Sequence, residues 1–411
     1  MTFRPYDPEK DRQAAFRVYR EAGWMGRSPE EEEMVGALLS GYNVMVAELE
    51  GSAECLVSTA PATLRYLKED LPVCAVMDVL TSHVARKQGL ASRLTALQLA
   101  RAAADGAVLA GLGMFEQGYY NRLGFGTGAY EHIVAFDPAG LRVKADHRIP
   151  ARLGEGDWQE VHAARLARMR MHGSFNILSA EVTRGALYHP KGILAYGYRD
   201  GPGGALSHCV CMASEGGEHG PYFVRVIAYR TREQFFELMA LLRSLGDQVH
   251  LMRMFEPPGI QMQDLLQQPF KRRRISERSS YEAGIYAAAW WQVRILDLPG
   301  CLARTHLPGP SVRFNLHLQD PVERYLEPGA PWRGVGGDYI VELGPCSGAE
   351  PGSDPSLPTL ATTVNAFTRL WLGVACATSL AMTDDLSGPD ELLSQLEETL
   401  RLPTPLPGWQ F

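Results

Sequence analysis

Residues 76–126 show a regular pattern of hydrophobic and polar positions. Residues 76–81 form a short apolar run that is typical of a strand. Apolar residues then recur at steps of three and four, which predicts a helix with one apolar face that ends at Asp105-Gly106. The residues of this face are Leu90, Leu94, Leu97, Ala100 and Ala104. Residues 108–115 are apolar again, so the pattern predicts a strand, a turn, a helix and a strand in this order.

The turn between the first strand and the helix is basic and contains a glycine, in the order Arg86-Lys87-Gln88-Gly89-Leu90-Ala91. A helix that starts near Gly89 leaves its first backbone N–H groups unpaired, with partial positive charge pointing outward. Glycine has no Cβ, so a ligand can approach the backbone closely there. The turn therefore predicts a phosphate or pyrophosphate site, with a basic helix start exposed to water as the alternative. It matches neither the Gly-x-Gly-x-x-Gly fingerprint nor a P-loop.

The segments on either side of this stretch follow a related plan. Ahead of residue 76 the pattern predicts two helices, the second with Ser28 as its N-cap, and then a β-hairpin. After residue 149 it predicts a helix, three strands, a helix that starts at Thr231 and another strand (residues 158–171, 193–198, 207–213, 222–229, 234–245 and 248–255). This part lacks a basic glycine turn, since Tyr229-Arg230-Thr231-Arg232 follows its third strand. We interpret it as a duplicate that has lost the phosphate site.

A third part is predicted from residue 281 onward. It contains strands at 290–296, 312–318, 339–343 and 360–364 and helices at 365–372 and 389–401. The tail that follows is extended, because its prolines cannot continue a helix, and it carries Trp409 and Phe411. Residues 271–274 are a short basic run in an acidic protein, which is more typical of a solvated loop than of a nucleic-acid site.

The composition is that of a globular protein with two or three domains. The 411 residues are 45% hydrophobic and 21% charged, and the net charge of −7 argues against a general nucleic-acid binder. Seven scattered cysteines indicate reduced thiols in a cytoplasm. The N-terminus has no apolar signal region, and the longest uncharged apolar run, residues 370–382, is too short for a membrane span. We therefore expect a soluble cytoplasmic protein.

The order of elements, followed by the motif Tyr120-x-Arg122-x-Gly124-Phe125, resembles the GNAT superfamily of acyl-coenzyme A N-acyltransferases. The superfamily signature, Arg/Gln-x-x-Gly-x-Gly/Ala, corresponds here to Arg86 to Ala91 and holds the coenzyme A pyrophosphate. The three-part plan further resembles the enhanced intracellular survival (Eis) family of bacterial N-acetyltransferases. This resemblance implies an α+β fold with mixed α/β sheets and tandem GNAT domains. The catalytic domain would span residues 1–148, the degenerate one 149–280, and a sterol-carrier-protein-like domain 281–411.

The resemblance also implies roles for particular residues. Acetyl-coenzyme A would be the co-substrate, without a metal, and Tyr120 the general acid that protonates the leaving thiolate. The residues that would bind the co-substrate lie on the first strand, the turn and the end of the second strand: Val79, Leu80, Thr81, Arg86, Lys87, Gln88, Gly89, Leu90, Ala91, Ser92, Phe115 and Glu116. The C-terminus would reach the active site, where the α-carboxylate of Phe411 would serve as the base. An α-carboxylate has a pKa near 3.5, so it would need burial or a relaying water, and a frayed tail is the alternative.

The expected acceptor is an amine on a small cationic molecule, such as an aminoglycoside or a polyamine, or the lysine of a peptide. No motif fixes this pocket, and Asn121 and Leu123 stand where better-known members carry Gly and Phe. The resemblance further implies a homo-oligomer such as a hexamer, whereas neither nucleic acid nor a membrane is an expected partner. Two other functions stay open, namely a lipid- or sterol-binding protein with a vestigial acyltransferase domain, and a protein-interaction scaffold without coenzyme affinity.

Overall fold

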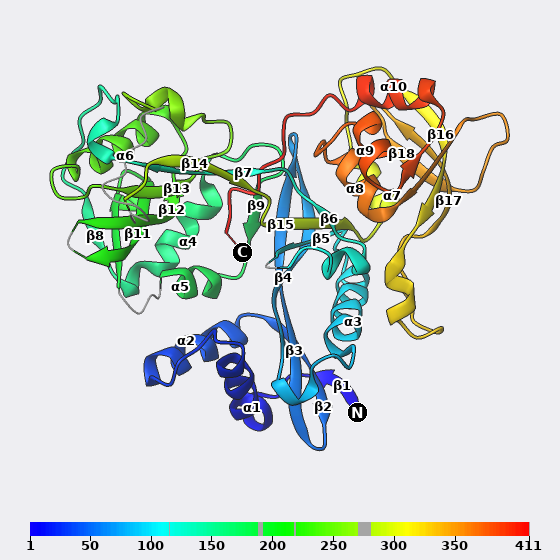
Figure 1. Ribbon diagram of the computed structural model, residues 1–411, viewed down its shortest axis with the longest axis horizontal. Coiled ribbons are helices and arrows are strands. Elements are labelled where there is room, and N and C mark those ends of the chain that lie inside the picture. The colour runs from blue at the N-terminus through cyan, green and yellow to red at the C-terminus, as the bar shows by residue number, and fades with distance from the viewer. Residues whose placement is uncertain (115, 188–191, 218, 270–280, 411) are drawn as a thin grey trace.

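The structure is a computed structural model that describes residues 1–114, 116–187, 192–217, 219–269 and 281–410. Phe115, Phe411 and residues 271–274 lie outside the described residues. The described strands form three β-sheets, and Figure 1 shows the first of them between the other two. Parallel and antiparallel pairs occur in each sheet, and helices accompany all three. The predicted class, mixed α/β sheets in an α+β fold, is confirmed.

The first sheet has the strand order β1–β2–β3–β4–β5–β15–β6, and β9 pairs with β3 beside this path. Its long central hairpin consists of β3 (Ser52–Tyr66) and β4 (Glu69–Thr81). The other strands are β1 (Thr2–Pro5), β2 (Asn43–Leu49), β5 (Leu109–Gly113), β6 (Gly126–Thr127), β9 (Phe175–Ile177) and β15 (Trp291–Ile295). β4 and β5 run parallel, as the predicted strand–helix–strand order requires.

Three helices accompany the first sheet: α1 (Pro8–Glu21), α2 (Pro29–Ser40) and α3 (Leu90–Ala104). The Ser28 hydroxyl accepts a hydrogen bond from the Glu31 backbone N–H, and the Glu31 carboxylate accepts one from the Ser28 N–H. This capping box confirms the predicted start of α2. In α3, Leu94 and Leu99 are fully buried in the core beneath the sheet. Burial of this face fixes the N-terminus of α3 at the end of β4.

The second sheet repeats this plan in the order β14–β7–β13–β12–β11–β10–β8. Its parallel pair, β12 and β13, is joined through α6, just as β4 and β5 are joined through α3. The strands are β7 (Glu131–Phe136), β8 (Ala151–Leu153), β10 (Ile193–Tyr198), β11 (His208–Gly217), β12 (Gly220–Ala228), β13 (Met252–Phe255) and β14 (Gly284–Ala288). The helices are α4 (Trp158–Ala167), α5 (Glu181–Leu187) and α6 (Arg232–Ser244).

The third sheet has the order β18–β17–β16–β19–β20. Its strands are β16 (Val312–Gln319), β17 (Gly337–Leu343), β18 (Gly348–Pro351), β19 (Thr359–Thr363) and β20 (Leu386–Ser387). The helices beside it are α7 (Leu298–Leu302), α8 (Val364–Trp371), α9 (Ala377–Thr383) and α10 (Asp390–Thr399). The tail then leaves this part and crosses to the junction of the first two sheets, where the last described residue lies (Figure 1).

The sheets do not follow the expected boundaries after residues 148 and 280. β7 precedes residue 148 but lies in the second sheet, and β9 follows it but pairs with β3. β15, expected in the third part, lies between β5 and β6 of the first sheet. Alternation of side chains predicts that a segment is a strand, but it carries no information on which strand edge it will pair with. The chain thus passes back through the first sheet after the second is complete.

Packing ties the third part firmly to the first sheet. The ring of Tyr66 on β3 stacks on Trp371 of α8 with centroids 4.5 Å apart, and its hydroxyl donates to the Trp371 carbonyl. Arg294 on β15 has no exposed surface and forms a 2.6 Å ion pair with Asp320. Removal of either partner would leave a buried charge unpaired, at a cost of about 3–5 kcal/mol. These contacts hold the tail-bearing part in a fixed place beside the first sheet.

Two further findings concern the environment of the protein. All seven cysteines are free thiols. Within the described part of the chain, no helix combines the length and the apolar composition needed to cross a lipid bilayer.

Candidate active site

The parallel strands β4 and β5 separate at the point where the sequence predicts co-substrate binding. Their last paired residues are Val76 and Leu112. Opposite β3, Ser58 pairs with Asp78 and Thr59 with Val76, so Met77 is the extra residue of a β-bulge. Within the described residues, the β4 segment that follows, including Val79, Leu80 and Thr81, has no partner on β5. Its backbone groups on that edge can hydrogen-bond an extended ligand, as an added strand would.

The basic turn lies at the end of this gap. Lys87 and Gly89 both have positive φ, at 62° and 74°, and Gly89 is the N-cap of α3. No side chain caps this helix, and a Cβ at Gly89 would meet nothing within 4 Å. The first N–H groups of α3 are therefore open to an anion, with exposed Arg86 and Lys87 beside them. These features fit a pyrophosphate.

The other predicted binding residues differ in what they can offer. Gln88 is exposed, whereas Leu90 is 2% exposed and packs into the core, so only its backbone can reach a ligand. Ala91 is half-buried, and the half-buried Ser92 donates a 3.2 Å hydrogen bond to the Tyr119 hydroxyl. Glu116 is exposed just beyond β5, and Phe115 is outside the described residues. The turn and the β4 edge thus come together in the structure.

Tyr120 lies at the start of a short 3₁₀ turn, Tyr120–Leu123. It is 4% exposed, and its ring packs edge-on against Tyr119 and Phe125, with centroids 4.8 Å and 6.2 Å away. Burial raises the pKa of Tyr120 above its ordinary value of 10, and the neighbouring Tyr119 and Asp78 act in the same direction. Its hydroxyl is therefore protonated at neutral pH, and it has no hydrogen-bond partner in the described part of the chain. A protonated, uncommitted hydroxyl can act as a general acid.

A cavity of about 610 Å³ lies between the first and second sheets, where β4 and β5 separate. Met77 and Asp78 line it from β4, Gly113 and Met114 continue it at the end of β5, and Gln410 reaches it from the tail. Its remaining lining comes from helices, connecting segments, β15, the second sheet and the tail: Trp24, Leu38, Tyr42, Glu131, Arg165, Val182, Gly185, Ala186, Phe223, Arg225, Phe255, Trp290, Trp291 and Trp409. The cavity is large enough for a small-molecule acceptor and opens beside the splayed strands.

Asp78 is a site residue that the sequence analysis missed. Its carboxylate accepts a 2.8 Å hydrogen bond from the hydroxyl of Tyr19 on α1. Burial raises the pKa of Asp78, although this hydrogen bond and Ser58 act in the opposite direction. A lone aspartate inside the apolar run of β4 was the available signal, because a strand that is buried on both faces rarely contains one.

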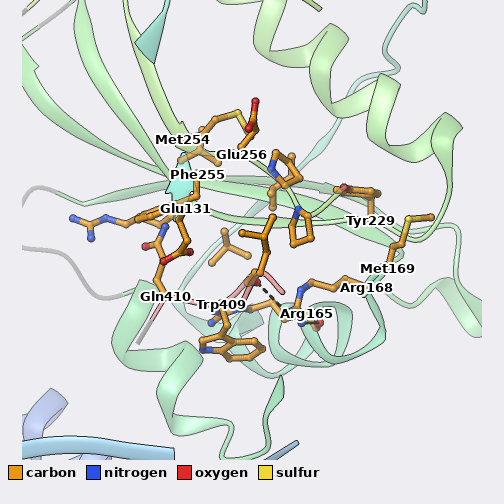
Figure 2. A pocket seen from close by; sticks show the side chains of 18 of the residues that line it. Glu131, Arg165, Arg168, Met169, Tyr229, Met254, Phe255, Glu256, Trp409 and Gln410 are labelled. Carbon is orange, nitrogen blue, oxygen red and sulfur yellow. Dashed lines mark hydrogen bonds between the residues drawn. The ribbon is translucent and has the colours of Figure 1, made fainter. Parts of the chain in front are cut away.

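The described part of the tail passes beside β9. The backbone N–H of Phe175 donates to the Pro407 carbonyl at 2.8 Å, and the Leu406 N–H to the His172 carbonyl at 3.1 Å. Trp409 is 4% exposed, and the guanidinium of Arg165 lies 3.6 Å above its ring. Figure 2 shows Arg165 beside Trp409. Arg168 donates a hydrogen bond, 2.9 Å long, to the Gly408 carbonyl. Trp409 is therefore buried, whereas the expected role of the Phe411 carboxylate stays a prediction.

A second, smaller cavity of about 70 Å³ adjoins the first on the side of the second sheet (Figure 2). Both cavities share Glu131, Arg165, Arg225, Phe255, Trp409 and Gln410. Burial raises the pKa of Glu131 to about 8, so this carboxyl is mostly neutral at pH 7. Burial lowers the pKa of Arg165 to about 10 and that of Arg168 to about 9, and both remain protonated at pH 7.

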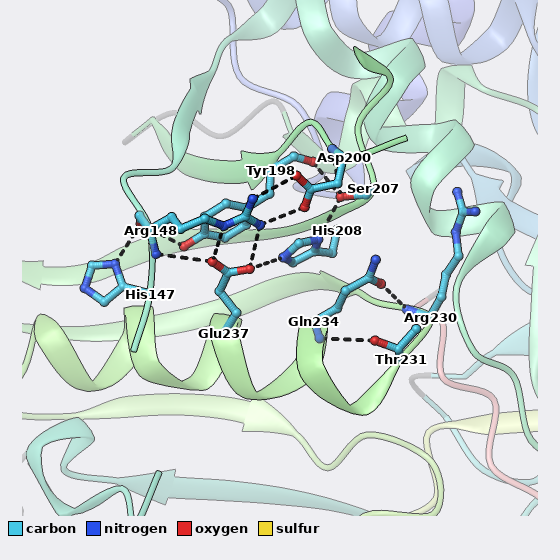
Figure 3. A network of polar contacts seen from close by, with 10 residues as sticks. All are labelled: His147, Arg148, Tyr198, Asp200, Ser207, His208, Arg230, Thr231, Gln234 and Glu237. Atoms are coloured by element: carbon cyan, nitrogen blue, oxygen red, sulfur yellow. Dashed lines mark hydrogen bonds and ion pairs between the residues drawn. The ribbon is translucent and has the colours of Figure 1, made fainter. Parts of the chain in front are cut away.

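One other polar cluster has the residue types of a metal site. Ligand atoms of Asp200, His208 and Glu237 lie within 4.8 Å of one another. Figure 3 shows that the Arg148 guanidinium pairs with both carboxylates, at 2.7 Å to Asp200 and 2.8 Å to Glu237. These charge-assisted hydrogen bonds lower the pKa of Glu237 to about 2. We therefore interpret the cluster as an ion-pair network that attaches the segment before β8 to the second sheet.

Comparison with known proteins agrees with this geometry. Residues 2–128 match the family described as an acetyltransferase (GNAT) domain. Together with the site, this match makes the protein an acyltransferase whose first part is a GNAT domain. Enzymes with this domain use acetyl-coenzyme A, and the open turn and the free β4 edge fit that co-substrate.

Several solved structures share the whole three-sheet arrangement. A probable N-acyltransferase of unknown function from Enterococcus faecalis V583 superposes with a TM-score of 0.79 at 17% identity, covering 100% of this chain and 99% of its own. A GCN5-related N-acetyltransferase from Anabaena variabilis ATCC 29413 superposes with a TM-score of 0.78 at 13% sequence identity. Eis1 from Mycobacterium abscessus superposes with a TM-score of 0.72 at 15% sequence identity. Each match covers 100% of both chains. At these identities the likeness shows the fold. No curated protein sequence matches the chain.

Proposed function

We propose that the protein transfers the acetyl group of acetyl-coenzyme A to a primary amine, which is a cation in water before it reacts. The observation that carries this proposal is a continuous path along β4. The path begins at the open N-terminus of α3, follows the unpaired edge of β4 and ends at Asp78, beside Tyr120 and the large cavity. A pyrophosphate, an extended arm and an acceptor could occupy it in this order.

Acetyl-coenzyme A supplies an activated thioester, and the residues of the chain supply orientation and proton transfer. During the reaction a C–N bond forms, the C–S bond breaks, one proton leaves the amine and one proton is given to the thiolate. Tyr120 gives the second proton, because burial keeps its hydroxyl protonated. Backbone groups of Val79, Leu80 and Thr81 hold the pantetheine arm, and the residues from Arg86 to Ser92 hold the pyrophosphate.

The base that we propose is the α-carboxylate of Phe411. The support for this assignment is the position of Gln410, which lines the cavity, and the burial of Trp409. Asp78 lines the same cavity, and we propose that it holds the ammonium form of the acceptor before the proton leaves. The two carboxylates would thus act in succession on the same nitrogen.

A lipid- or sterol-binding function has weaker support. The third part borders a cavity of about 420 Å³ whose lining is Pro308, Gly309, Pro310, Glu398, Thr399 and Arg401. Two of these six residues are charged and none is a large apolar residue, which is unlike a lipid site. We also propose, from the resemblance to the Eis family, that the chain belongs to that family, has a sterol-carrier-like third domain and forms a homo-oligomer.

The decisive experiment measures thiol release from acetyl-coenzyme A with added amines, together with calorimetric binding of coenzyme A. We expect amine-dependent release, and we expect Tyr120→Phe to lower kcat by about 10²- to 10⁴-fold while coenzyme affinity persists. One residue appended after Phe411 should abolish turnover and leave coenzyme affinity unchanged. Full activity in the extended chain would overturn the assignment of Phe411, and no release with any amine would overturn the proposed function.

A further inference from the structure

The large cavity is bordered by two β-bulges, one from each repeat. In the first sheet the bulged residue is Met77, directly after the last β4–β5 pair. In the second sheet Cys211 pairs with Val226 and Met212 with Val224, so Arg225 is the extra residue. It directly follows Val224, which forms the last β12–β13 pair with Met254. A bulge changes the direction of a side chain, and Met77 and Arg225 both line the same cavity.

The two walls of this cavity carry opposite charges. The first sheet contributes Asp78, which lies next to the reacting end. The second repeat contributes Arg225 from β12 and Arg165 from α4, and these two also line the smaller cavity, which Asp78 does not reach. Glu131 of β7 lines both cavities as well, but burial raises its pKa to about 8, so it adds little negative charge at pH 7. The arginines therefore mark the end of the cavity that is remote from Asp78.

Neither arginine has a carboxylate partner within the described residues. Arg225 lies over the ring of Phe223, 5.0 Å from its centre. Arg165, 5% exposed, donates to the Thr183 hydroxyl at 2.9 Å and stacks on Trp409. Buried cations are normally paired, as Arg294 is with Asp320, because an unpaired one is costly. The buried indole N–H of Trp409 also has no acceptor in the described part of the chain. Arg225, Arg165 and Trp409 are therefore three donors at this end that have no anionic partner among the described residues.

Seven of the nineteen residues that line this cavity are aromatic: Trp24, Tyr42, Phe223, Phe255, Trp290, Trp291 and Trp409. Trp24 and Trp290 keep about half of their surface exposed, at 47% and 50%, so part of each ring is open to a ligand. Such a lining suits a flat apolar body, whereas it offers few partners for the many ammonium and hydroxyl groups of a polycation.

We propose that the acceptor carries a primary amine and an anionic group at opposite ends of an aromatic or similarly flat apolar body. Its ammonium group lies at Asp78, its body between the aromatic side chains, and its anionic group at Arg225 and Arg165. The proposal rests on the proposed acetyl transfer and narrows its acceptor. Arg225 is then a specificity-determining residue that the second, degenerate repeat contributes to the active site of the first.

The test compares 4-(aminomethyl)benzoate with benzylamine, which lacks the carboxylate, and with spermidine and an aminoglycoside. We expect the aminobenzoate to have a kcat/KM about ten-fold or more above that of benzylamine, and both to exceed the polycations. Arg225→Gln should lower kcat/KM for 4-(aminomethyl)benzoate about ten-fold and leave kcat/KM for benzylamine nearly unchanged. Arg230→Gln is the matched control, because Arg230 is exposed on the same repeat and lines neither cavity.

Faster turnover of spermidine or the aminoglycoside would overturn the inference and leave the proposed function intact. An equal loss for both aromatic amines in Arg225→Gln would also overturn it, since Arg225 would then act on the protein itself. If no amine is acetylated, the proposed function fails, and calorimetric binding of 4-(aminomethyl)benzoate then decides the inference. Binding that Arg225→Gln weakens would support it, and no binding would overturn it.

Discussion

The two parallel strand pairs, β4–β5 and β12–β13, are built alike and end differently. Each pair is joined by one helix, and each loses its pairing next to a bulged residue, Met77 or Arg225. α3 begins at Gly89 with no side-chain cap, whereas α6 begins at Thr231, whose hydroxyl accepts a hydrogen bond from the Gln234 N–H at 3.3 Å (Figure 3). The first helix leaves its N–H donors to a ligand, and the second satisfies one of them internally.

Both repeats therefore have a splayed strand pair, but the helix start that follows it is open to an anion only in the first repeat. The second repeat keeps the bulge and the splay, but it lacks the positive-φ glycine that opens the helix start. After β5 the first repeat continues to Tyr120, while Glu256-Pro257-Pro258 follows β13. The second repeat therefore retains only the geometry that aims Arg225 into the cavity.

The largest effect on coenzyme binding is expected from placing the same carboxylate at both helix starts. Gly89→Asp brings a negative charge to the N–H groups that would hold the pyrophosphate. We expect acetyl-coenzyme A binding to weaken about 100-fold, equivalent to about 2.7 kcal/mol. Thr231→Asp is the matched change in the second repeat, where aspartate is an equally good N-cap, and it should leave the affinity unchanged. Calorimetry measures both, and similar binding by the two variants would contradict the assignment of the turn.

The elements that the sequence predicted well are those whose signals are local. The spacing of the leucines predicts α3, and Ser28-Pro29 predicts the start of α2. The glycine turn predicts the open start of α3. Each of these signals depends only on neighbouring residues. Sheet membership could not be predicted in this way. β7, β9 and β15 pair with strands far away in the chain, and periodicity does not identify a partner.

The same reason explains which site residues were missed. Asp78 was visible as a polar residue in an apolar run, but its neighbour Tyr19 is 59 positions away. Arg225 faces the cavity because the pairing register shifts between β11 and β12 at this point. A register shift depends on both strands, so it cannot be predicted from the sequence of either strand alone. Tyr120 is predicted as a site residue because a motif of neighbouring residues contains it.

The two repeats also differ in the pKa values of the carboxyl groups that line the cavity, Glu131 from the second sheet and Asp78 from the first. Glu131, on the wall of the second sheet, has a pKa of about 8 in the folded protein because of burial, against about 4.5 when unfolded. The folded protein therefore retains a proton that the unfolded chain loses, and stability falls as pH rises from about 5 to 8. Glu131→Gln stays neutral, so we expect its stability advantage over the parent to be about 4 kcal/mol larger at pH 9 than at pH 5. Unfolding in urea at the two pH values measures this, and a gap independent of pH would contradict the burial of Glu131.

Asp78 provides the control for this measurement. Its raised pKa is offset in part by hydrogen bonds from Tyr19 and Ser58. Asp78→Asn should therefore give a smaller pH-dependent gap than Glu131→Gln, while it lowers acetylation more strongly. The reverse order of the two gaps would show that the wall of the first sheet is the less hydrated one.

The smallest expected effect concerns the cap that closes the second helix. Thr231→Ala removes one hydrogen-bond acceptor and should lower the free energy of unfolding by about 1 kcal/mol. Acetyl-coenzyme A should still bind at one site per chain, because the positive-φ glycine at the start of α3 has no counterpart at the start of α6. Gly89→Ala is the paired change, and it should weaken both stability and coenzyme binding, since alanine is strained at a φ of 74°. A second coenzyme site in Thr231→Ala would contradict this expectation. It would mean that the Thr231 side chain, rather than the absence of a basic glycine turn, prevents the second repeat from binding coenzyme A.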